Sequence, residues 1–261
     1  MSKILNLTKE SHVWHLTLSR PDKGNALNME LIRELTRVFL EADVDPNLRI
    51  VVLSGEGKHF CSGGDIEWMK QSMNLSAEEN TKQISELYAL FASIDQCSKA
   101  TLGKIHGAAF GGGLGLVSCL DFSFCLESSK FSLSEARIGL MPATIVPYVS
   151  KKIGWARCRS LGIRANIFGA YDAKTWGLVT DVYDSESDQQ HHIEECIEDI
   201  LLCSPQSVKT YKGLVNHMIY HDEDHIKQHA IEGISKLRQS SEGQEGLKAF
   251  LEKRKPSWIK S

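Results

Sequence analysis

The sequence has no excess of basic residues. Its 30 Lys and Arg residues are outnumbered by 33 Asp and Glu residues, which gives a formal net charge of −3. Proteins that bind nucleic acids or anionic membrane surfaces usually present a strongly positive face, so this balance argues against both classes of partner. No dense run of lysines interleaved with aromatic residues is present, which also argues against RNA binding.

Cysteine pairs and membrane-length apolar runs are missing too. The seven cysteines are odd in number, include no C-x-x-C pair, and in several cases stand inside apolar runs, where cysteine is usually a small buried hydrophobe. This usage fits a reducing compartment. No apolar stretch reaches the roughly 20 residues of a membrane-spanning helix, and the first residues lack the apolar core of a secretory signal. We therefore expect a cytoplasmic protein with no membrane partner.

The chain does have enough apolar residues for a sizeable core, with 42% of its 261 residues hydrophobic. Alternation over 13–18 predicts a half-buried strand, the apolar face of 29–42 predicts a helix, and 49–55 is typical of a buried strand. Strand, helix and strand in succession indicate a parallel sheet. Further strands are predicted at 101–105, 122–126 and 178–182.

The last third of the chain differs from the rest because it is polar and periodic in the helical sense. Helices are predicted at 189–202, 205–221, 225–239 and 242–254. We therefore predict an α/β fold with two regions. Residues 1–184 would hold the sheet and the site, and residues 185–261 would form a helical region that packs on this core or on a neighbouring subunit.

Two glycine turns, each after a predicted parallel strand, are the main functional signal. Gly111–Gly113 stand between two apolar runs and would present bare N–H groups at the start of a helix. Ser62–Gly64 follow the strand at 49–55. Such turns can bring two N–H donors, those of Gly64 and Gly112, to the same edge of a sheet, where they would stabilise a negatively charged oxygen. The alternative is a tight packing turn without chemistry.

A single acid follows the second glycine turn. Glu135 is surrounded in the sequence by apolar and small residues, so burial would raise its pKa and suit it to proton transfer next to a carbonyl group. It could instead be a surface glutamate. Asp65 is expected to cap the helix that follows the first turn, and Trp68 is expected to pack in the core or to line an acyl pocket.

Several blocks of the sequence together carry a family resemblance. They are HFCSGGDIEWM, HGAAFGGGLGLVSCLDF, FSLSEARIGLMPATI and SEGQEGLKAFLEKRKPSW, preceded by RPDKGNAL. In this order and spacing they cover essentially the whole chain, which resembles the crotonase (enoyl-CoA hydratase/isomerase) superfamily. The resemblance implies a β-β-α spiral core with a C-terminal helical trimerisation region, and homotrimers or hexamers. It also implies an acyl-CoA substrate, with no metal and no cofactor beyond the coenzyme A of that substrate.

The resemblance also implies roles for individual positions. Gly64 and Gly112 would hold the thioester oxygen, and Glu135 would act as acid and base. Phe250 and Lys253 match positions that reach the coenzyme A bound by an adjacent subunit, where a lysine suits the phosphates. The remaining positions implied to bind substrate are Lys23, Ala26, Ser62, Asp65, Ile66 and Trp68.

Gly115 departs from the family pattern, because the first of two hydratase glutamates is expected there. Glu135 alone would suffice to move a double bond, which favours an isomerase. The surrounding blocks resemble the bacterial methylglutaconyl-CoA hydratases, whose members also carry glycine at this place, and this favours hydration of 3-methylglutaconyl-CoA. Arg137 or Lys70 could then bind the second carboxylate of the substrate. A non-catalytic acyl-CoA-binding or RNA-binding relative is a further alternative.

Histidines provide weaker signals. Four of them follow one another at four-residue steps, at His217, His221, His225 and His229, which could place metal ligands on one helix face. The acids at 222–224 interrupt this spacing and indicate a helix break, so we expect no metal site. His59 and His106 flank the glycine turns, where we expect hydrogen-bonded packing residues rather than bases.

Overall fold

The predicted strand-helix-strand unit forms as expected and begins a larger sheet. Strand β2 (Val13–Leu18) pairs in parallel with β3 (Ile50–Gly55), with Leu16 opposite Leu53. Between them, helix α1 (Met29–Val44) starts where the Asn28 side chain accepts the Leu31 N–H, and it buries one apolar face. The structure, a computed structural model, describes residues 4–218 and 222–259.

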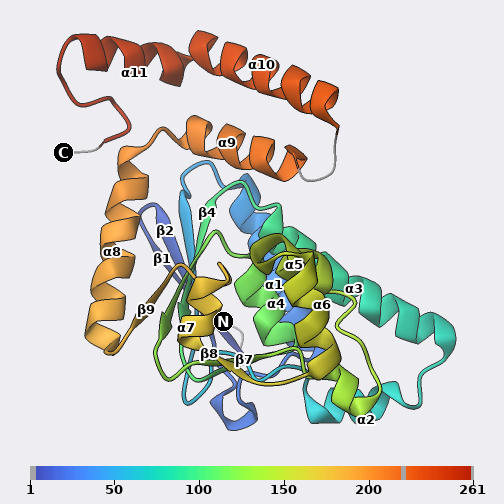
Figure 1. Ribbon diagram of the computed structural model, residues 1–261. Coiled ribbons are helices and arrows are strands. Elements are labelled where there is room, and N and C mark those ends of the chain that lie inside the picture. Colours follow the sequence, from blue (N-terminus) through green and yellow to red (C-terminus); the bar gives the residue numbers. More distant parts are fainter. Residues whose placement is uncertain (1–3, 219–221, 260–261) are drawn as a thin grey trace. The chain divides into compact units, whose positions relative to one another are not determined.

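The main sheet has six strands in the order β1-β2-β3-β4-β6-β9. Figure 1 labels β1, β2, β4 and β9 of this sheet. The four further strands are β1 (Leu5–Glu10), β4 (Ala100–Ile105), β6 (Phe122–Leu126) and β9 (Asp181–Tyr183). Strand β1 is antiparallel to β2, whereas β6 runs parallel to both β4 and β9. The parallel strands therefore bring their carboxyl ends, and the turns that follow them, to one edge.

A second, three-stranded sheet consists of β5 (Ala108–Phe110), β7 (Lys130–Ser132) and β8 (Phe168–Gly169). The sequence did not predict these strands, because two or three residues are too few to show a period. They matter for the site because β5 leads directly into the second glycine turn and β7 leads to Glu135.

Helices cover the sheets of this first unit. They include α2 (Ile66–Ser72), α3 (Ala77–Asp95), α4 (Gly112–Cys119), α5 (Val146–Ile153), α6 (Trp155–Arg164) and α7 (Ala170–Thr175), with short 3-10 turns η1 (Pro21–Lys23) and η2 (Glu135–Ile138). The predicted capping box of Ser76 and Glu79 starts α3. Every residue of α4 after Gly112 is buried, so this helix lies in the middle of the core.

The chain divides into two compact units. Among the described residues, the first consists of 4–97 and 101–193, and the second of 98–100, 194–218 and 222–259, so that the division falls within α8 (Glu186–Leu202). The second unit is helical, with α9 (Pro205–Met218), α10 (Glu223–Gln239) and α11 (Ser241–Leu251). Asp222 caps α10, which agrees with the predicted helix break at 222–224.

Several sequence features have simple structural outcomes. Five of the seven cysteines are buried, and burial raises the pKa of Cys61 to about 12, as expected for an unreactive core thiol. Along residues 4–218 and 222–259, no helix combines the length and apolar character that crossing a bilayer requires. In the same ranges no three His, Cys, Asp or Glu side chains gather as metal ligands. The rings of His217 and His229 stack with centroids 4.2 Å apart, and His221 lies outside the described residues.

Candidate active site

The two glycine turns lie side by side. Cys61, which follows β3, forms an isolated parallel bridge with Ala109 of β5. The N–H of Cys61 donates to the Ala108 carbonyl at 3.0 Å, and the N–H of Phe110 donates to the Cys61 carbonyl at 3.1 Å. The two turns are therefore neighbours, as predicted, but the second follows β5 of the three-stranded sheet and not a strand of the main sheet.

Gly64 forms an isolated parallel bridge with Leu27, and its N–H points away from that residue. Leu27 donates to the Gly63 carbonyl at 2.7 Å and accepts the Asp65 N–H at 2.9 Å. In such a parallel bridge the enclosed residue, here Gly64, directs its own N–H and C=O to the opposite side. Gly64 is exposed, and its N–H has no acceptor within the described residues. It is free to bind a ligand oxygen.

The second donor is at the start of α4. Gly111 has φ +46°, a conformation that glycine adopts without strain. This turn makes Gly112 the first residue of the helix, where the leading N–H groups have no partner inside the helix. Gly112 is partly exposed, and its N–H donates to no acceptor in the part of the chain that the structure describes. The positive end of the α4 dipole adds to its preference for a negatively charged oxygen.

Glu135 lies directly against this second turn. A Cβ atom added to Gly111 would lie 2.9 Å from Glu135 Oε1. The other carboxyl oxygen, Oε2, is inaccessible to solvent and has no hydrogen-bond partner among the described residues. Burial raises the pKa of Glu135, which suits a group that must both take and return a proton.

Gly115 lies one turn further along α4 and is tightly enclosed. A Cβ atom at this position would lie 2.3 Å from Ile145 Cγ2 and 2.8 Å from Phe91 Cε1. Both neighbours are fully or almost fully buried. The space that an acidic side chain at 115 would need is therefore occupied by hydrocarbon.

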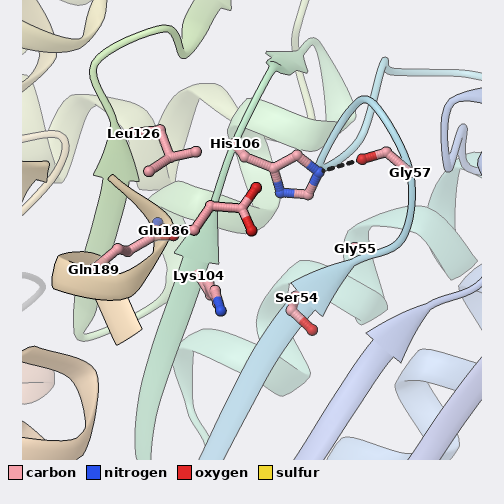
Figure 2. A pocket seen from close by; sticks show the side chains of 8 residues that line it. All are labelled: Ser54, Gly55, Gly57, Lys104, His106, Leu126, Glu186 and Gln189. Atoms are coloured by element: carbon pink, nitrogen blue, oxygen red, sulfur yellow. Dashed lines mark hydrogen bonds between the residues drawn. The ribbon is translucent and has the colours of Figure 1, made fainter. Parts of the chain in front are cut away.

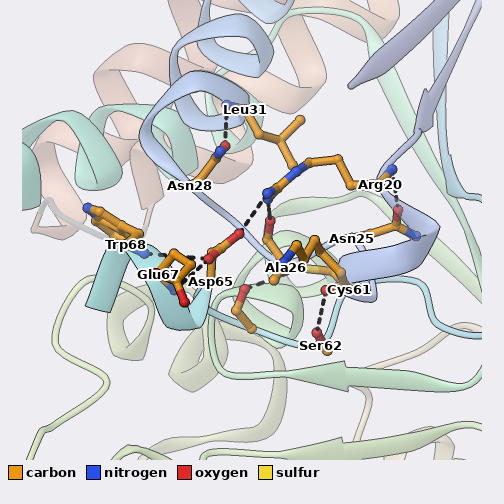
Figure 3. A network of polar contacts seen from close by, with 12 residues as sticks. Arg20, Asn25, Ala26, Asn28, Leu31, Cys61, Ser62, Asp65, Glu67 and Trp68 are labelled. Atoms are coloured by element: carbon orange, nitrogen blue, oxygen red, sulfur yellow. Dashed lines mark hydrogen bonds and ion pairs between the residues drawn. The ribbon is translucent and has the colours of Figure 1, made fainter. Parts of the chain in front are cut away.

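An ion pair fixes the segment that follows Gly64 (Figure 3). Arg20 Nη2 lies 2.6 Å from Asp65 Oδ2, with exposed side-chain fractions of 12% and 5%. Asp65 Oδ1 accepts the Glu67 N–H at 2.7 Å and caps α2, as predicted. Burial favours the neutral acid, but the Arg20 hydrogen bond and charge and the backbone donors outweigh it, so the pKa of Asp65 is lowered.

The other predicted substrate-binding residues occupy different environments. Lys23 is exposed at the end of η1, and its carbonyl accepts the Ser62 hydroxyl at 3.4 Å, while Ala26 is buried. Ile66 is 67% exposed next to the first turn. Trp68 is half-buried against the core and donates to Gln83 Oε1 at 2.6 Å.

Phe250 and Lys253 belong to the second unit. Phe250, in the last turn of α11, is 81% exposed. Lys253 is exposed just beyond this helix and has φ +54°.

A comparison with protein families tests the family resemblance that the sequence blocks carry. Residues 8–261 match the family described as Enoyl-CoA hydratase/isomerase. The chain belongs to this family. The two free N–H groups and the buried carboxyl therefore occur in a member of the enoyl-CoA hydratase/isomerase family.

Family members similar to this chain include both isomerases and hydratases. A peroxisomal Delta(3,5)-Delta(2,4)-dienoyl-CoA isomerase of Arabidopsis thaliana is 28% identical, covering 99% of this chain and 96% of the relative. An enoyl-CoA hydratase of Alternaria alternata is 32% identical over 80% of this chain and 68% of the relative. The crystal structure of an enoyl-CoA hydratase from Shewanella pealeana superposes with a TM-score of 0.93 at 34% identity, over 98% of this chain and 96% of that one. The crotonase fold of the first unit is therefore confirmed.

Some residues in and around the candidate site were not singled out from the sequence. Arg20 pairs with an acid 45 positions away, and Ile145 fills space next to a glycine 30 positions away. Asn25 is completely buried with φ +55°. No short-range pattern in the sequence points to these partners, so only the fold reveals them.

Proposed function

We propose that the protein is an enoyl-CoA hydratase that adds water across the α,β double bond of an acyl-CoA thioester. The observation that carries this proposal is the position of the Glu135 carboxyl, whose Oε1 lies 2.9 Å from a Cβ built on Gly111, next to the free N–H of Gly112. The thioester oxygen would bind between the N–H groups of Gly64 and Gly112. Each such donor typically lowers the barrier by about 3 kcal/mol.

Glu135 would carry both proton transfers of the reaction. Its carboxylate would take a proton from water while the water oxygen bonds to the β-carbon and the π electrons move towards the thioester. The resulting enolate oxygen would be stabilised by the two N–H groups. Glu135 would then return the proton to the α-carbon, which completes the hydration without a second acid.

The substrate that we propose is 3-methylglutaconyl-CoA, which carries a second carboxylate. Arg137 supports this assignment because it lies in η2 together with Glu135. Its Nε donates to the Ala165 carbonyl at 2.8 Å, and no acidic side chain pairs with its guanidinium among the described residues. Lys70, the other candidate cation, already pairs with Glu67 at 2.9 Å.

A double-bond isomerase is the second candidate, and the enclosed Gly115 favours it. With Ile145 and Phe91 against Gly115, this position offers no second carboxyl to orient water. One carboxylate is enough to remove a proton from one carbon and return it two carbons away. The Arabidopsis relative is also an isomerase.

We further propose that the protein works as a homotrimer or hexamer in which Phe250 and Lys253 of one subunit contact the coenzyme A bound by the next. Their exposure and the positive charge of Lys253 fit such a role. No cofactor is proposed apart from the coenzyme A of the substrate. Sedimentation of the purified protein would test the oligomer.

Two assays on purified protein test the reaction. One follows loss of the enoyl-thioester absorbance of 3-methylglutaconyl-CoA and crotonyl-CoA, and the other follows double-bond migration in a 3-enoyl-CoA. Glu135→Gln is compared with Glu67→Gln, an exposed acid on the helix after Gly64. Hydration that only Glu135→Gln abolishes supports the proposal. Migration without hydration makes the protein an isomerase, and coenzyme A binding without either reaction makes it a non-catalytic binder.

A further inference from the structure

The register between the two glycine turns depends on a short parallel ladder. Segment 59–61 runs beside segment 106–110. The Phe60 N–H donates to the His106 carbonyl at 2.9 Å, and Cys61 and Phe110 form the two bonds of the bridge described above. Beyond this ladder the two segments continue to Gly64 and Gly112. Any shift along the ladder therefore changes the separation of the two free N–H groups.

One bond of this ladder is made by a side chain. Regular continuation of the parallel pattern would have the Ala108 N–H donate to the carbonyl of His59. That carbonyl instead accepts the Asn25 side-chain amide at 2.7 Å. The Ala108 N–H donates to Nδ1 of the His59 ring at 3.1 Å. The imidazole of His59 thus replaces its own backbone as acceptor.

This contact fixes the state of the ring. A backbone N–H can only donate, so Nδ1 of His59 must carry no proton, and the neutral ring has its proton on Nε2. Burial lowers the pKa of His59, and the nearby charges of Lys58 and His106 lower it further. The nitrogen that faces the ladder is therefore occupied and is not available as a base.

His106 also contacts the residues just before segment 59–61 (Figure 2). Its Nε2 lies 2.9 Å from the Gly57 carbonyl oxygen, in the wall of a cavity of about 280 Å³ that contains none of the predicted site residues. The backbones are also in contact at Gly107, where an added Cβ would lie 2.0 Å from the Lys58 carbonyl oxygen. These backbone contacts limit movement of the two segments. The Ala108 N–H differs from them because its acceptor is a side chain.

We propose that His59 is a positioning residue, whose Nδ1 holds Ala108 so that the N–H groups of Gly64 and Gly112 converge on one oxygen. This inference rests on the proposed function, because it concerns how the thioester oxygen is held. Hydrogen bonds weaken steeply as their geometry departs from the optimum, and a site of this kind needs its groups held to within about 0.5 Å. Loss of the Nδ1 acceptor would leave the Ala108 N–H unpaired and loosen the segment that leads to Gly112.

Two matched substitutions separate this role from mere packing. In His59→Asn the side-chain oxygen can take the place of Nδ1, whereas in His59→Gln the amide reaches the place of Nε2. We expect His59→Gln to lower kcat about tenfold with KM changed less than about twofold. His59→Asn should stay within about twofold of wild type in both parameters.

The decisive measurement is the infrared carbonyl stretch of bound crotonyl-CoA labelled with ¹³C at the thioester carbon. It is recorded in a Glu135→Gln background, so that the thioester is not consumed. A pair of well-placed donors shifts this band to lower frequency. We expect the full shift both with His59 retained and with the His59→Asn substitution, and a smaller shift with His59→Gln.

The outcomes distinguish this inference from the proposed function. Equal shifts and equal kcat in His59→Asn and His59→Gln would overturn the positioning role while leaving the oxygen site intact. A lowered melting temperature with an unchanged shift would also overturn it, because His59 would then only stabilise the fold. Absence of any shift with the His59 protein would overturn the proposed function, and the positioning role with it.

Discussion

Ile145 Cγ2 would lie 2.3 Å from a Cβ atom placed on Gly115. This contact explains in physical terms why the departure from the family pattern at 115 is more than a change of one residue. The neighbouring side chains of Ile145 and Phe91 have taken the space, so the glycine and its neighbours form one packed unit. The packing leaves no room for a second carboxyl at position 115, which agrees with the proposed mechanism in which Glu135 acts alone.

Gly115→Ala should therefore destabilise the protein, although alanine usually stabilises a helix. We expect a loss of about 1–3 kcal/mol in the free energy of unfolding, because a buried clash must be relieved. Gly162→Ala on α6 is the matched control, since its Cβ would meet only Leu133 Cδ1, at 4.0 Å. The free energy of unfolding of Gly162→Ala should rise by up to about 1 kcal/mol. Urea denaturation of both variants measures these changes, and equal effects would show that Gly115 is not enclosed as described.

Glu135→Gln should lower kcat by at least about a hundredfold and yet make the protein more stable at neutral pH. Burial raises the pKa of Glu135 in the folded state, so the charged form is disfavoured there relative to the unfolded chain, where the pKa is about 4.3. The folded state then binds more protons, and wild-type stability falls as the pH rises from the unfolded pKa through the folded pKa. Glutamine does not titrate.

The gain from Glu135→Gln should accordingly be full above the folded pKa and disappear below about pH 4. Thermal unfolding from about pH 3 to about pH 8 measures the difference between the two proteins. Glu67→Gln is again the control and should change stability by less than about 0.5 kcal/mol, as is usual for exposed residues. A gain that does not vary with pH would contradict burial of the Glu135 carboxyl as its cause.

Asp65→Asn should cost about 3–5 kcal/mol of stability, because it leaves the buried guanidinium of Arg20 without a counter-charge. The cap on α2 would persist through the amide oxygen, so the loss reports the ion pair. Because the pKa of Asp65 is lowered in the fold, its contribution is present above the unfolded pKa of about 3.9 and is lost as the pH falls through the folded pKa. The free energy of unfolding, measured by denaturant titration, should thus fall between about pH 7 and about pH 3 far more for wild type than for Asp65→Asn.

The sequence predicted those parts of the fold and site whose signal lies within a short stretch. Alternation identified β2, apolar periodicity identified α1, and the Ser76–Glu79 spacing identified the start of α3. Gly64, Gly112 and Glu135 were singled out as candidates because such residues are unusual in their surroundings. In each case the residues that form the feature are near neighbours along the chain.

The parts that escaped prediction depend on contacts between distant residues. Strands β5, β7 and β8 are too short for a pattern and exist because they pair with one another. His59 was expected to be a hydrogen-bonded packing residue, and it is hydrogen-bonded, but its partner Ala108 lies 49 positions away and could not be named from the sequence. Nothing in the two stretches, taken separately, indicates that the Asn25 side chain donates to the His59 carbonyl, which would otherwise accept the Ala108 N–H. Such three-way contacts arise only once the sheet has formed.

Arg137→Gln tests the proposed substrate class. If the guanidinium binds the second carboxylate of 3-methylglutaconyl-CoA, its loss should raise KM for that substrate about 10- to 100-fold, which corresponds to a charged hydrogen bond of about 1.5–3 kcal/mol. Crotonyl-CoA has no second carboxylate, so its KM should be unchanged. Lys70→Gln is the control cation and should affect neither substrate, because Lys70 already pairs with Glu67. An equal rise for both substrates would mean that Arg137 supports the Glu135 segment through the Ala165 carbonyl and does not select the acyl group.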